Sequence, residues 1–363
     1  AFFGMSMKFT SCSLAQIYRR VKPDGSVLGG PMVYLDEGIR DRIPALAPLG
    51  KVLAVLFAVL TVFAAFGGGN MFQGNQMFSM LDRQFGVGQN NAYIVGLILA
   101  ALVGVVIIGG IRRIGEVTSK LVPLMCGFYC VVCLTIIGLN IANVPAVFAD
   151  IFSSAFRPEA AYGGLIAVLI TGAKRAAFSN EAGLGSAAIA HAAARTNEPI
   201  REGIVAMIGP FIDTILVCTM TALAILITNS HLDPATGGPA EAEGVEITAS
   251  AFESLGVALP YFLCLAVFIF AYSTMISWSY YGERAVEYLF GTVGILPYRL
   301  VYLVFVVLGP ILSLQAVIDF SDMMLLSMSF PNIIGMVLLS GLVGVKARDY
   351  IGRLRSGEMK PVS

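Results

Sequence analysis

Charged side chains are scarce in this sequence. Only 13% of its 363 residues are Asp, Glu, Lys or Arg, and 57% are hydrophobic. A soluble domain carries about 25% charged and about 45–50% apolar residues. The deficit is too large for a globular core and indicates a protein whose solvent is a lipid bilayer. Lys and Arg balance Asp and Glu at 23 each, so net charge argues neither for nor against nucleic acid, and we expect no nucleic-acid partner.

The six cysteines form neither a metal-binding pattern nor a disulfide framework. Cys126, Cys130 and Cys133 lie one helical turn apart in "LMCGFYCVVCLTII", without a histidine or carboxylate nearby to complete a metal site. We interpret them as small packing residues. The other three cysteines are scattered among apolar stretches, which excludes a small disulfide-stapled fold.

Long apolar runs are abundant instead. Runs of about 20 residues are typical of membrane-spanning helices, so we expect an all-α polytopic membrane protein. The first run already covers residues 1–18 without an initiator methionine, and we expect the sequence to be a fragment lacking its true N-terminus. The further spans are expected at 51–84, 91–111, 117–139, 162–192, 202–228, 259–281, 298–318 and 321–345.

The basic residues gather on one side of the membrane if these nine spans alternate in direction. Only Arg83 and Arg157 of the 23 lysines and arginines lie on the other side, and Lys174 and Arg175 fall within a span. The positive-inside rule makes the basic side cytoplasmic. The longest opposite loop, 229–246, has four acidic residues and no Lys or Arg. We expect a multi-pass protein of the bacterial inner membrane.

One span, 162–192, contains the polar stretch "TGAKRAAFSNEAGLGS". An ionised side chain at the bilayer centre costs roughly 2.5 kcal/mol or more, and a helical glycine costs up to about 1 kcal/mol. We therefore predict a discontinuous helix, whose two ends offer free backbone groups to a ligand near the midplane. In the alternative, Lys174 and Arg175 snorkel from a shifted span, which leaves Asn180, Glu181 and the glycines unexplained.

A second polar stretch, "GGGNMFQGNQ", interrupts the span at 51–84. Asn70 and Gln73 are one turn apart on one helix face, and the three glycines allow another backbone to approach closely. The alternative is a motif for helix–helix packing, in which small and polar residues join neighbouring helices.

A third polar stretch, "STMISWSYYGE", lies in the span at 259–281. Ser273 and Thr274 offer hydroxyls of the kind a small cation needs, and Trp278 is the only tryptophan of the chain. An indole ring can close one side of a small pocket. Helix–helix packing is again the alternative.

These stretches, together with "GGPMVYL" at 29–35, resemble the alanine/glycine:cation symporter family in the same order along nearly the whole chain. The resemblance implies the leucine-transporter-like fold, with two inverted five-helix halves that each begin with a broken helix. The span at 162–192 would open the second half, and the broken helix of the first half would precede Ala1. We thus expect one transport domain, with the rest of the first repeat at 1–139, the second repeat at 160–345 and a cytoplasmic tail at 346–363.

The resemblance also implies site residues. The positions that match the family's substrate contacts are Gln73, Ser179, Asn180, Gly183, Thr274 and Trp278. By the logic of the fold, Ser273 and Thr274 would supply hydroxyls to a sodium ion. Family members often have threonine where Ser273 stands, and that change keeps the hydroxyl.

The expected function is secondary active transport: sodium-coupled symport of a small neutral amino acid, alanine or glycine, by alternating access. We expect no enzymatic activity, no organic cofactor, Na⁺ as the coupling ion, a lipid bilayer as surroundings and a monomer. The sequence leaves open alanine against glycine, Na⁺ against H⁺, and the stereochemistry of the substrate.

Two rival functions are weaker. An intramembrane hydrolase would need Ser179 and His191 to meet, although they lie twelve residues apart on what would be one helix. A passive channel would need a repeated carbonyl filter or a charged ring, and the sequence has neither. The role of Glu181 stays open between proton acceptor, helix-end anchor and ion-pair partner of Lys174 or Arg175, of which we favour the ion pair.

Overall fold

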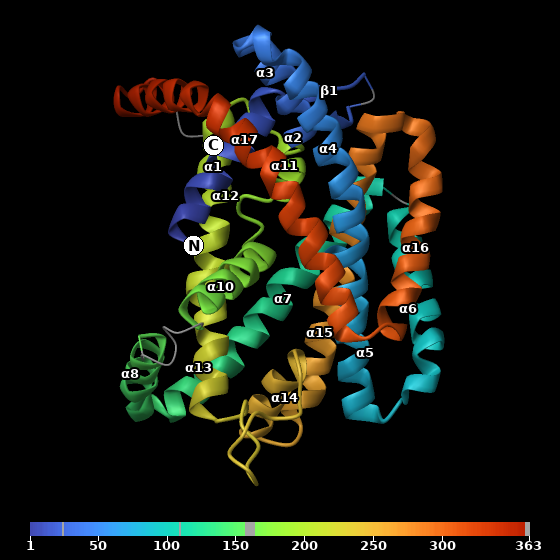
Figure 1. The fold of residues 1–363 in the computed structure, drawn as a ribbon, viewed down its shortest axis with the longest axis vertical. Helices are drawn as coiled ribbons and strands as arrows, with labels where there is room; N and C mark the ends of the chain where they lie inside the picture. The colour runs from blue at the N-terminus through green and yellow to red at the C-terminus, as the bar shows by residue number, and fades with distance from the viewer. Residues whose placement is uncertain (24, 109, 157–163, 360–363) are drawn as a thin grey trace.

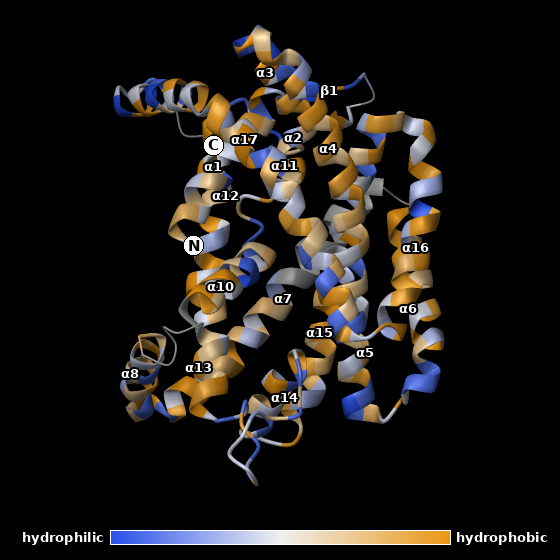
Figure 2. Ribbon diagram, in the orientation of Figure 1, coloured by the Kyte–Doolittle hydropathy of each residue, from blue (hydrophilic) through white to orange (hydrophobic). Residues whose placement is uncertain are grey.

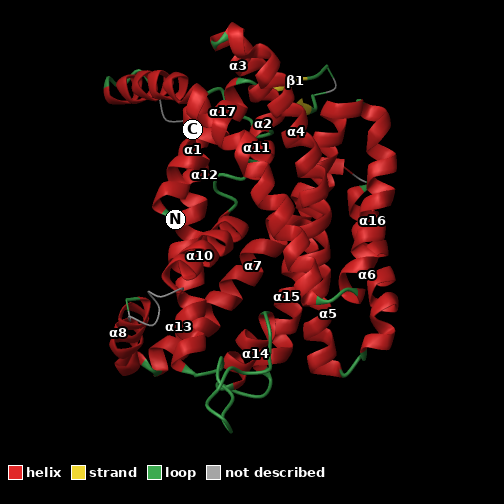
Figure 3. Cartoon of the chain, in the orientation of Figure 1, coloured by secondary structure: helices red, strands yellow, loops and turns green. Residues whose placement is uncertain are grey.

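A computed structural model describes residues 1–23, 25–108, 110–156 and 164–359. Helices make up nearly all of it, and one short antiparallel hairpin, β1 (Arg20–Val21) with β2 (Val27–Leu28), pairs Arg20 with Leu28 (Figure 1, Figure 3). The helices of the first half are α1 (Phe2–Ile17), α2 (Pro31–Val33), α3 (Ile39–Arg42), α4 (Ala47–Phe66), α5 (Phe72–Phe85), α6 (Ala92–Ile107), α7 (Gly110–Leu139) and α8 (Val144–Ala155). Those of the second half are α10 (Gly164–Asn180), α11 (Ser186–Ala192), α12 (Pro199–Pro210), α13 (Thr219–Ile227), α14 (Val245–Glu253), α15 (Leu259–Phe290), α16 (Ile295–Ile311) and α17 (Leu314–Arg355).

Several spans contain a short turn of another helix type. Three segments are π-helical, η1 (Tyr34–Gly38), η3 (Gly67–Met71) between α4 and α5, and η6 (Phe211–Cys218) between α12 and α13. The 3₁₀ turns are η2 (Pro44–Leu46), η4 (Gln89–Asn91), η5 (Ile141–Asn143) and η7 (Thr292–Gly294). π-Helical turns often mark functional sites, so η3 and η6 direct attention to the spans that contain them.

Six helical segments among the described residues are long and apolar enough to cross a membrane. They are Pro44–Phe85, Gln89–Ile107, Pro199–Ile227, Leu259–Phe290, Thr292–Ile311 and Leu314–Arg355. The pair Met125–Leu139 and Ile141–Ala155 makes a seventh if it counts as one span bent by 76°. Hydrophobic residues predominate along these helices (Figure 2). The predicted class, an all-α polytopic membrane protein, is confirmed.

One expected span takes a different course, and another shows the break that was predicted for it. The span expected at 298–318 is wrong at its end, because α16 ends at Ile311 and α17 begins at Leu314. Leu312 and Ser313 between them have extended backbone (ψ 153° and 146°), and the chain reverses inside an unbroken apolar run that hydropathy cannot divide. The span expected at 162–192 is discontinuous, as predicted: α10 and α11 are separated by five residues. The total of nine crossings stays a prediction.

The centre of the bundle is η3, where α4 and α5 meet α15, α16 and α17. A Cβ atom at Gly69 would overlap the side chain of Trp278 on α15, so the indole lies directly on the glycine backbone. From α16, the Tyr302 hydroxyl donates to the Met275 carbonyl at 2.7 Å, while Asn70 donates to the Tyr302 carbonyl at 2.9 Å. The glycines of η3 thus allow the close helix approach that the sequence predicted.

The contact at Gly69 gives the first prediction. Gly69→Ala should lower the melting temperature of the detergent-solubilised protein, since overpacking a filled core costs about 1–3 kcal/mol. Gly172→Ala on α10 is the matched control, because a Cβ there meets no atom within 4 Å. Equal melting temperatures for the two variants would contradict the packing of Trp278 on η3.

Candidate functional site

The break between α10 and α11 is built from left-handed backbone. Glu181, Gly183 and Gly185 have φ of +56°, +82° and +94°. The Asn180 side chain closes the turn by accepting a hydrogen bond from the Ala182 N–H at 2.9 Å, and Ser186 donates to Glu181 at 2.7 Å. Irregular backbone inside a bilayer has to find such partners within the protein, because lipid offers none.

Other helices satisfy the carbonyls of the break. Asn332 of α17 donates to the Gly183 carbonyl at 2.8 Å, and Lys8 of α1 donates to the Asn180 carbonyl at 2.9 Å. At the far end of α11, Arg19 donates to the Thr196 carbonyl at 2.7 Å and Gln16 to the Ala194 carbonyl at 3.2 Å. The break and α11 are therefore held by side chains from both ends of the chain.

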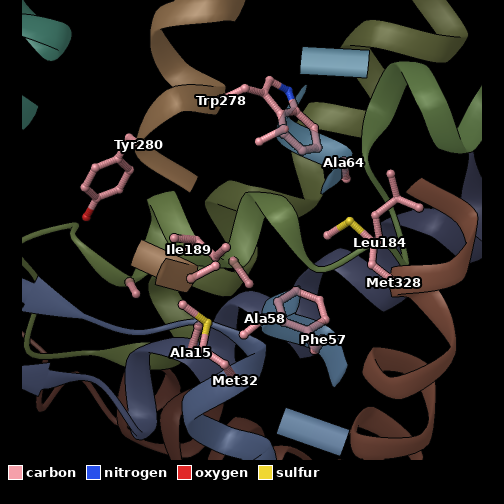
Figure 4. Packing of buried hydrophobic residues seen from close by; sticks show 14 of the residues in the cluster. Ala15, Met32, Phe57, Ala58, Ala64, Leu184, Ile189, Trp278, Tyr280 and Met328 are labelled. Atoms are coloured by element: carbon pink, nitrogen blue, oxygen red, sulfur yellow. The ribbon is translucent and has the colours of Figure 1, made fainter. Parts of the chain in front are cut away.

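Apolar packing fixes α11 against α1 and α2, and Phe57 of α4 lies beside its N-terminal end. Figure 4 shows Ile189 close to Ala15, Met32 and Phe57, all of which belong to one buried cluster. A Cβ at Gly185 would lie 2.7–2.9 Å from atoms of Pro31, Phe57 and Asn332. Only glycine fits this position, both for its backbone angle and for the lack of space.

The structure brings one group of the predicted site residues together around η3. Trp278 lies on Gly69, and Gln73, half-buried, donates to the Gly68 carbonyl at 3.0 Å. The ring of Phe178, the last aromatic of α10, lies over Gly68 and packs edge-on against Phe72 with ring centroids 5.1 Å apart. The end of α10 therefore meets the faces that carry Gln73 and Trp278.

Ser179 and Asn180 turn to the other side of the break, toward η6. Ser179 donates to the Asp213 carboxylate at 2.7 Å, and the Asn180 amide donates to the Thr214 hydroxyl at 2.8 Å. A cavity of about 260 Å³ opens here, with the charged residues Lys8, Glu181 and Asp213 in its wall. The side chains of Ser179 and Asn180 thus do not join Gln73 and Trp278, as a single predicted pocket would require. Gly183 meets Met7 and Asn332 instead.

The two residues predicted to bind sodium lie side by side on α15. Ser273 is buried, and its hydroxyl donates to the Phe270 carbonyl at 3.0 Å. Thr274 is half-buried, and in the described part of the chain its hydroxyl forms no hydrogen bond. Thr274 is one turn before Trp278 on the same helix face, so it offers an unused oxygen ligand next to the indole.

The ion pair that we favoured for Glu181 is wrong. Arg175 pairs with Asp322 of α17, and its guanidinium lies 5.3 Å from the centre of the Phe178 ring. Glu181 accepts the Ser186 hydroxyl instead and so anchors the first turn of α11. The left-handed backbone at Glu181 directs its carboxylate onward to α11, away from the helix turns that carry the two cations.

The Ser179–His191 pair of the hydrolase alternative does not form. Both residues line the same cavity. The His191 Nδ1 atom, however, bonds to Glu202 at 2.6 Å, while the Ser179 hydroxyl is committed to Asp213.

Sequence reasoning missed two charged residues of this cavity, Asp213 and Lys8. A signal for Asp213 was present, because it is the only charge in the interior of the span expected at 202–228. An ionisable residue inside a membrane span marks a functional site by default. Lys8 likewise interrupts the apolar run at 1–18.

The described helices define a polytopic membrane protein, and the proteins it resembles are symporters rather than enzymes. The chain belongs to the sodium:alanine symporter family, because the model of that family matches residues 1–363. It is therefore an integral protein of the plasma membrane that carries out cation-coupled amino-acid symport.

Curated relatives cover almost the whole chain. The sodium/alanine symporter AgcS of Methanococcus maripaludis is 42% identical over 361 residues, which are 99% of this chain and 77% of the relative. An uncharacterized transporter of Haemophilus influenzae is 37% identical, over 98% of this chain and 76% of the relative. The probable sodium/glutamine symporter GlnT of Bacillus subtilis is 32% identical, over 99% and 72%.

The tight seat of Gly185 gives a second prediction. Gly185→Ala should lower the melting temperature and abolish uptake, because it adds three overlaps to the cost of a left-handed residue, about 1–2 kcal/mol. Gly237→Ala is the control, since Gly237 has φ +68° but a Cβ there meets no atom within 4 Å. A Gly185→Ala protein as stable as Gly237→Ala would refute the packing described for the break.

Asp213 gives the third prediction. Asp213→Asn should keep the fold but slow cation-driven amino-acid uptake at least about tenfold, because a hydrogen bond to a charged group contributes about 1.5–3 kcal/mol. Asp150→Asn, an exposed change on α8, is the control. Unchanged uptake by Asp213→Asn would show that the carboxylate only packs η6 against α10.

Proposed function

We propose that the protein couples the uptake of a small neutral amino acid, alanine or glycine, to the entry of sodium. The observation that carries the proposal is the break at Glu181–Gly185, which follows the turn of α10 whose Phe178 ring lies over Gly68 of the Gly-rich η3. Broken spans of this kind place helix ends and free backbone groups where a zwitterion and a cation bind. The name of the relative AgcS, a sodium/alanine symporter, supports the same substrate pair.

The amino acid would bind between η3 and the break. Its charged groups would meet the helix ends and the Gln73 and Asn180 amides, while Trp278 would close the pocket. For this the Asn180 amide has to exchange its bond to Thr214 for the substrate. Phe178 and Trp278, both packed on η3 glycines, leave little room for a large side chain, which favours alanine or glycine.

Sodium would bind at Thr274 and Ser273 on α15. The Thr274 hydroxyl is uncommitted among the described residues, and the Ser273 hydroxyl would turn from the Phe270 carbonyl to the ion. Hydroxyl and carbonyl oxygens are the hard ligands that small cations prefer.

Alternating access would follow from rocking of one helix group against the other in an inverted-repeat fold. Coupling requires sodium and amino acid to raise each other's affinity by the same factor. The shared element for both would be α15, because Thr274 and Trp278 are one turn apart on it.

Uptake by the intact protein in proteoliposomes tests this function. Radiolabelled alanine should accumulate above its outside concentration only with an inward sodium gradient, and a proton gradient alone should not drive it. Unlabelled glycine should compete well, and glutamine poorly. Accumulation that ignores the sodium gradient would refute the coupling, and equilibration without accumulation would indicate a channel.

A conservative change separates the sodium ligand from the rest of the site. Thr274→Val should raise the sodium concentration for half-maximal uptake about tenfold, from the loss of one ligand worth about 1.5 kcal/mol. Thr135→Val is the control, because Thr135 is exposed on α7 and its hydroxyl donates to the Val131 carbonyl within the same helix. An unchanged sodium dependence in Thr274→Val would exclude this hydroxyl as a ligand.

A further inference from the structure

The last turns of α17 extend beyond what a bilayer needs. Its 42 residues measure about 63 Å, whereas the hydrocarbon core is about 30 Å thick. The apolar part of α17 ends at Val345, and Lys346 opens a basic stretch on the side that the charge distribution places in the cytoplasm. In Figure 1 these turns, dark red at the upper left, extend sideways from the bundle and across the direction of α4 and α16.

This terminal stretch, 345–355, is amphipathic. Ala347, Tyr350, Ile351 and Leu354 follow the i, i+3, i+4, i+7 spacing of one apolar helix stripe. Tyr350 is buried against the bundle, but Ile351 and Leu354 are 42% and 55% exposed. Two large apolar side chains are thus presented outward just where the hydrocarbon core ends.

The two edges of the apolar stripe differ in what their arginines contact. On one edge Arg353 donates two hydrogen bonds to the Glu198 carboxylate, at 2.8 and 2.9 Å. This bidentate ion pair holds the helix to the loop before α12. The Arg353 guanidinium keeps the pKa of Glu198 below its usual value, so this anchor is intact at neutral pH. On the other edge Arg348 and Arg355, two turns apart and exposed, form no ion pair among the described residues.

We propose that this stretch is an interfacial helix that binds anionic phospholipid headgroups of the cytoplasmic leaflet. Arg348 and Arg355 would hold lipid phosphates, because a guanidinium matches a phosphate with two parallel hydrogen bonds. Ile351 and Leu354 would enter the boundary between headgroups and acyl chains. A basic flank beside an exposed apolar stripe is the chemistry that a negatively charged membrane surface fits.

Trypsin accessibility of the unmodified protein tests the proposal. In nanodiscs that contain phosphatidylglycerol, cleavage after Arg348 and Arg355 should be at least about fivefold slower than in phosphatidylcholine nanodiscs. High salt should remove the protection, because it screens exposed charges. Cleavage after Arg40 and Arg42, exposed on α3 at the same side, is the internal control. Equal rates in the two lipids would overturn the proposal.

A variant pair makes the test specific to these arginines. Dioctanoyl phosphatidylglycerol, titrated into the detergent-solubilised protein, should raise its melting temperature. Arg348→Gln with Arg355→Gln should weaken this binding about 25-fold, from a fivefold loss for each arginine. Arg40→Gln with Arg42→Gln should leave it unchanged. If both variants lose the same affinity for the lipid, the binding is unspecific charge attraction. If soluble polyglutamate raises the melting temperature as much as the lipid does, the stretch binds an acidic protein partner. Either result overturns the proposal.

Discussion

The structure depends on the need to satisfy backbone polar groups at a place where lipid offers no partner. Five residues between α10 and α11 leave the helical path, and each unpaired group there would cost several kcal/mol in hydrocarbon. The Asn180 side chain, Lys8 and Asn332 meet that need from three separate helices. Because these three side chains have to reach the break, α1, α10 and α17 have to lie around it.

The same logic explains why η3 is rich in glycine. The end of α10 is exposed by the break, so neighbouring side chains and backbone have to pack against it without a gap. Trp278 lies directly on the backbone of Gly69, where a Cβ would overlap the indole, and Phe178 lies over Gly68, where a Cβ would come within 3.3 Å of its ring. The guanidinium of Arg175 makes a cation–π contact with the ring of Phe178 and an ion pair with Asp322. The polar break and the apolar centre are therefore one packing unit, with aromatic rings between them.

How far the sequence predicted this site follows from the range of each interaction. The break was predictable, because the costs of Glu181, Gly183 and Gly185 in a continuous membrane helix are local and additive. The partners were not, because Ser179 meets Asp213 across 34 residues and Arg175 meets Asp322 across 147. For the same reason the turn at Leu312–Ser313 was missed, since a reversal inside an apolar run leaves no trace in hydropathy. The assignment of Gln73, Thr274 and Trp278 to one substrate site stays a prediction.

The hydrogen bonds of the break connect two groups of helices. Lys8 and Thr214 belong to α1 and the α12–η6 span, which pack against each other, whereas Asn332 belongs to α17, which packs with α4. If one group rocks against the other, the break cannot keep all of these bonds at once. Each exchanged bond is worth about 1 kcal/mol net, so a ligand that replaces one or two of them is enough to shift the balance between states. An amino acid bound at the break would therefore act where the two helix groups are already coupled.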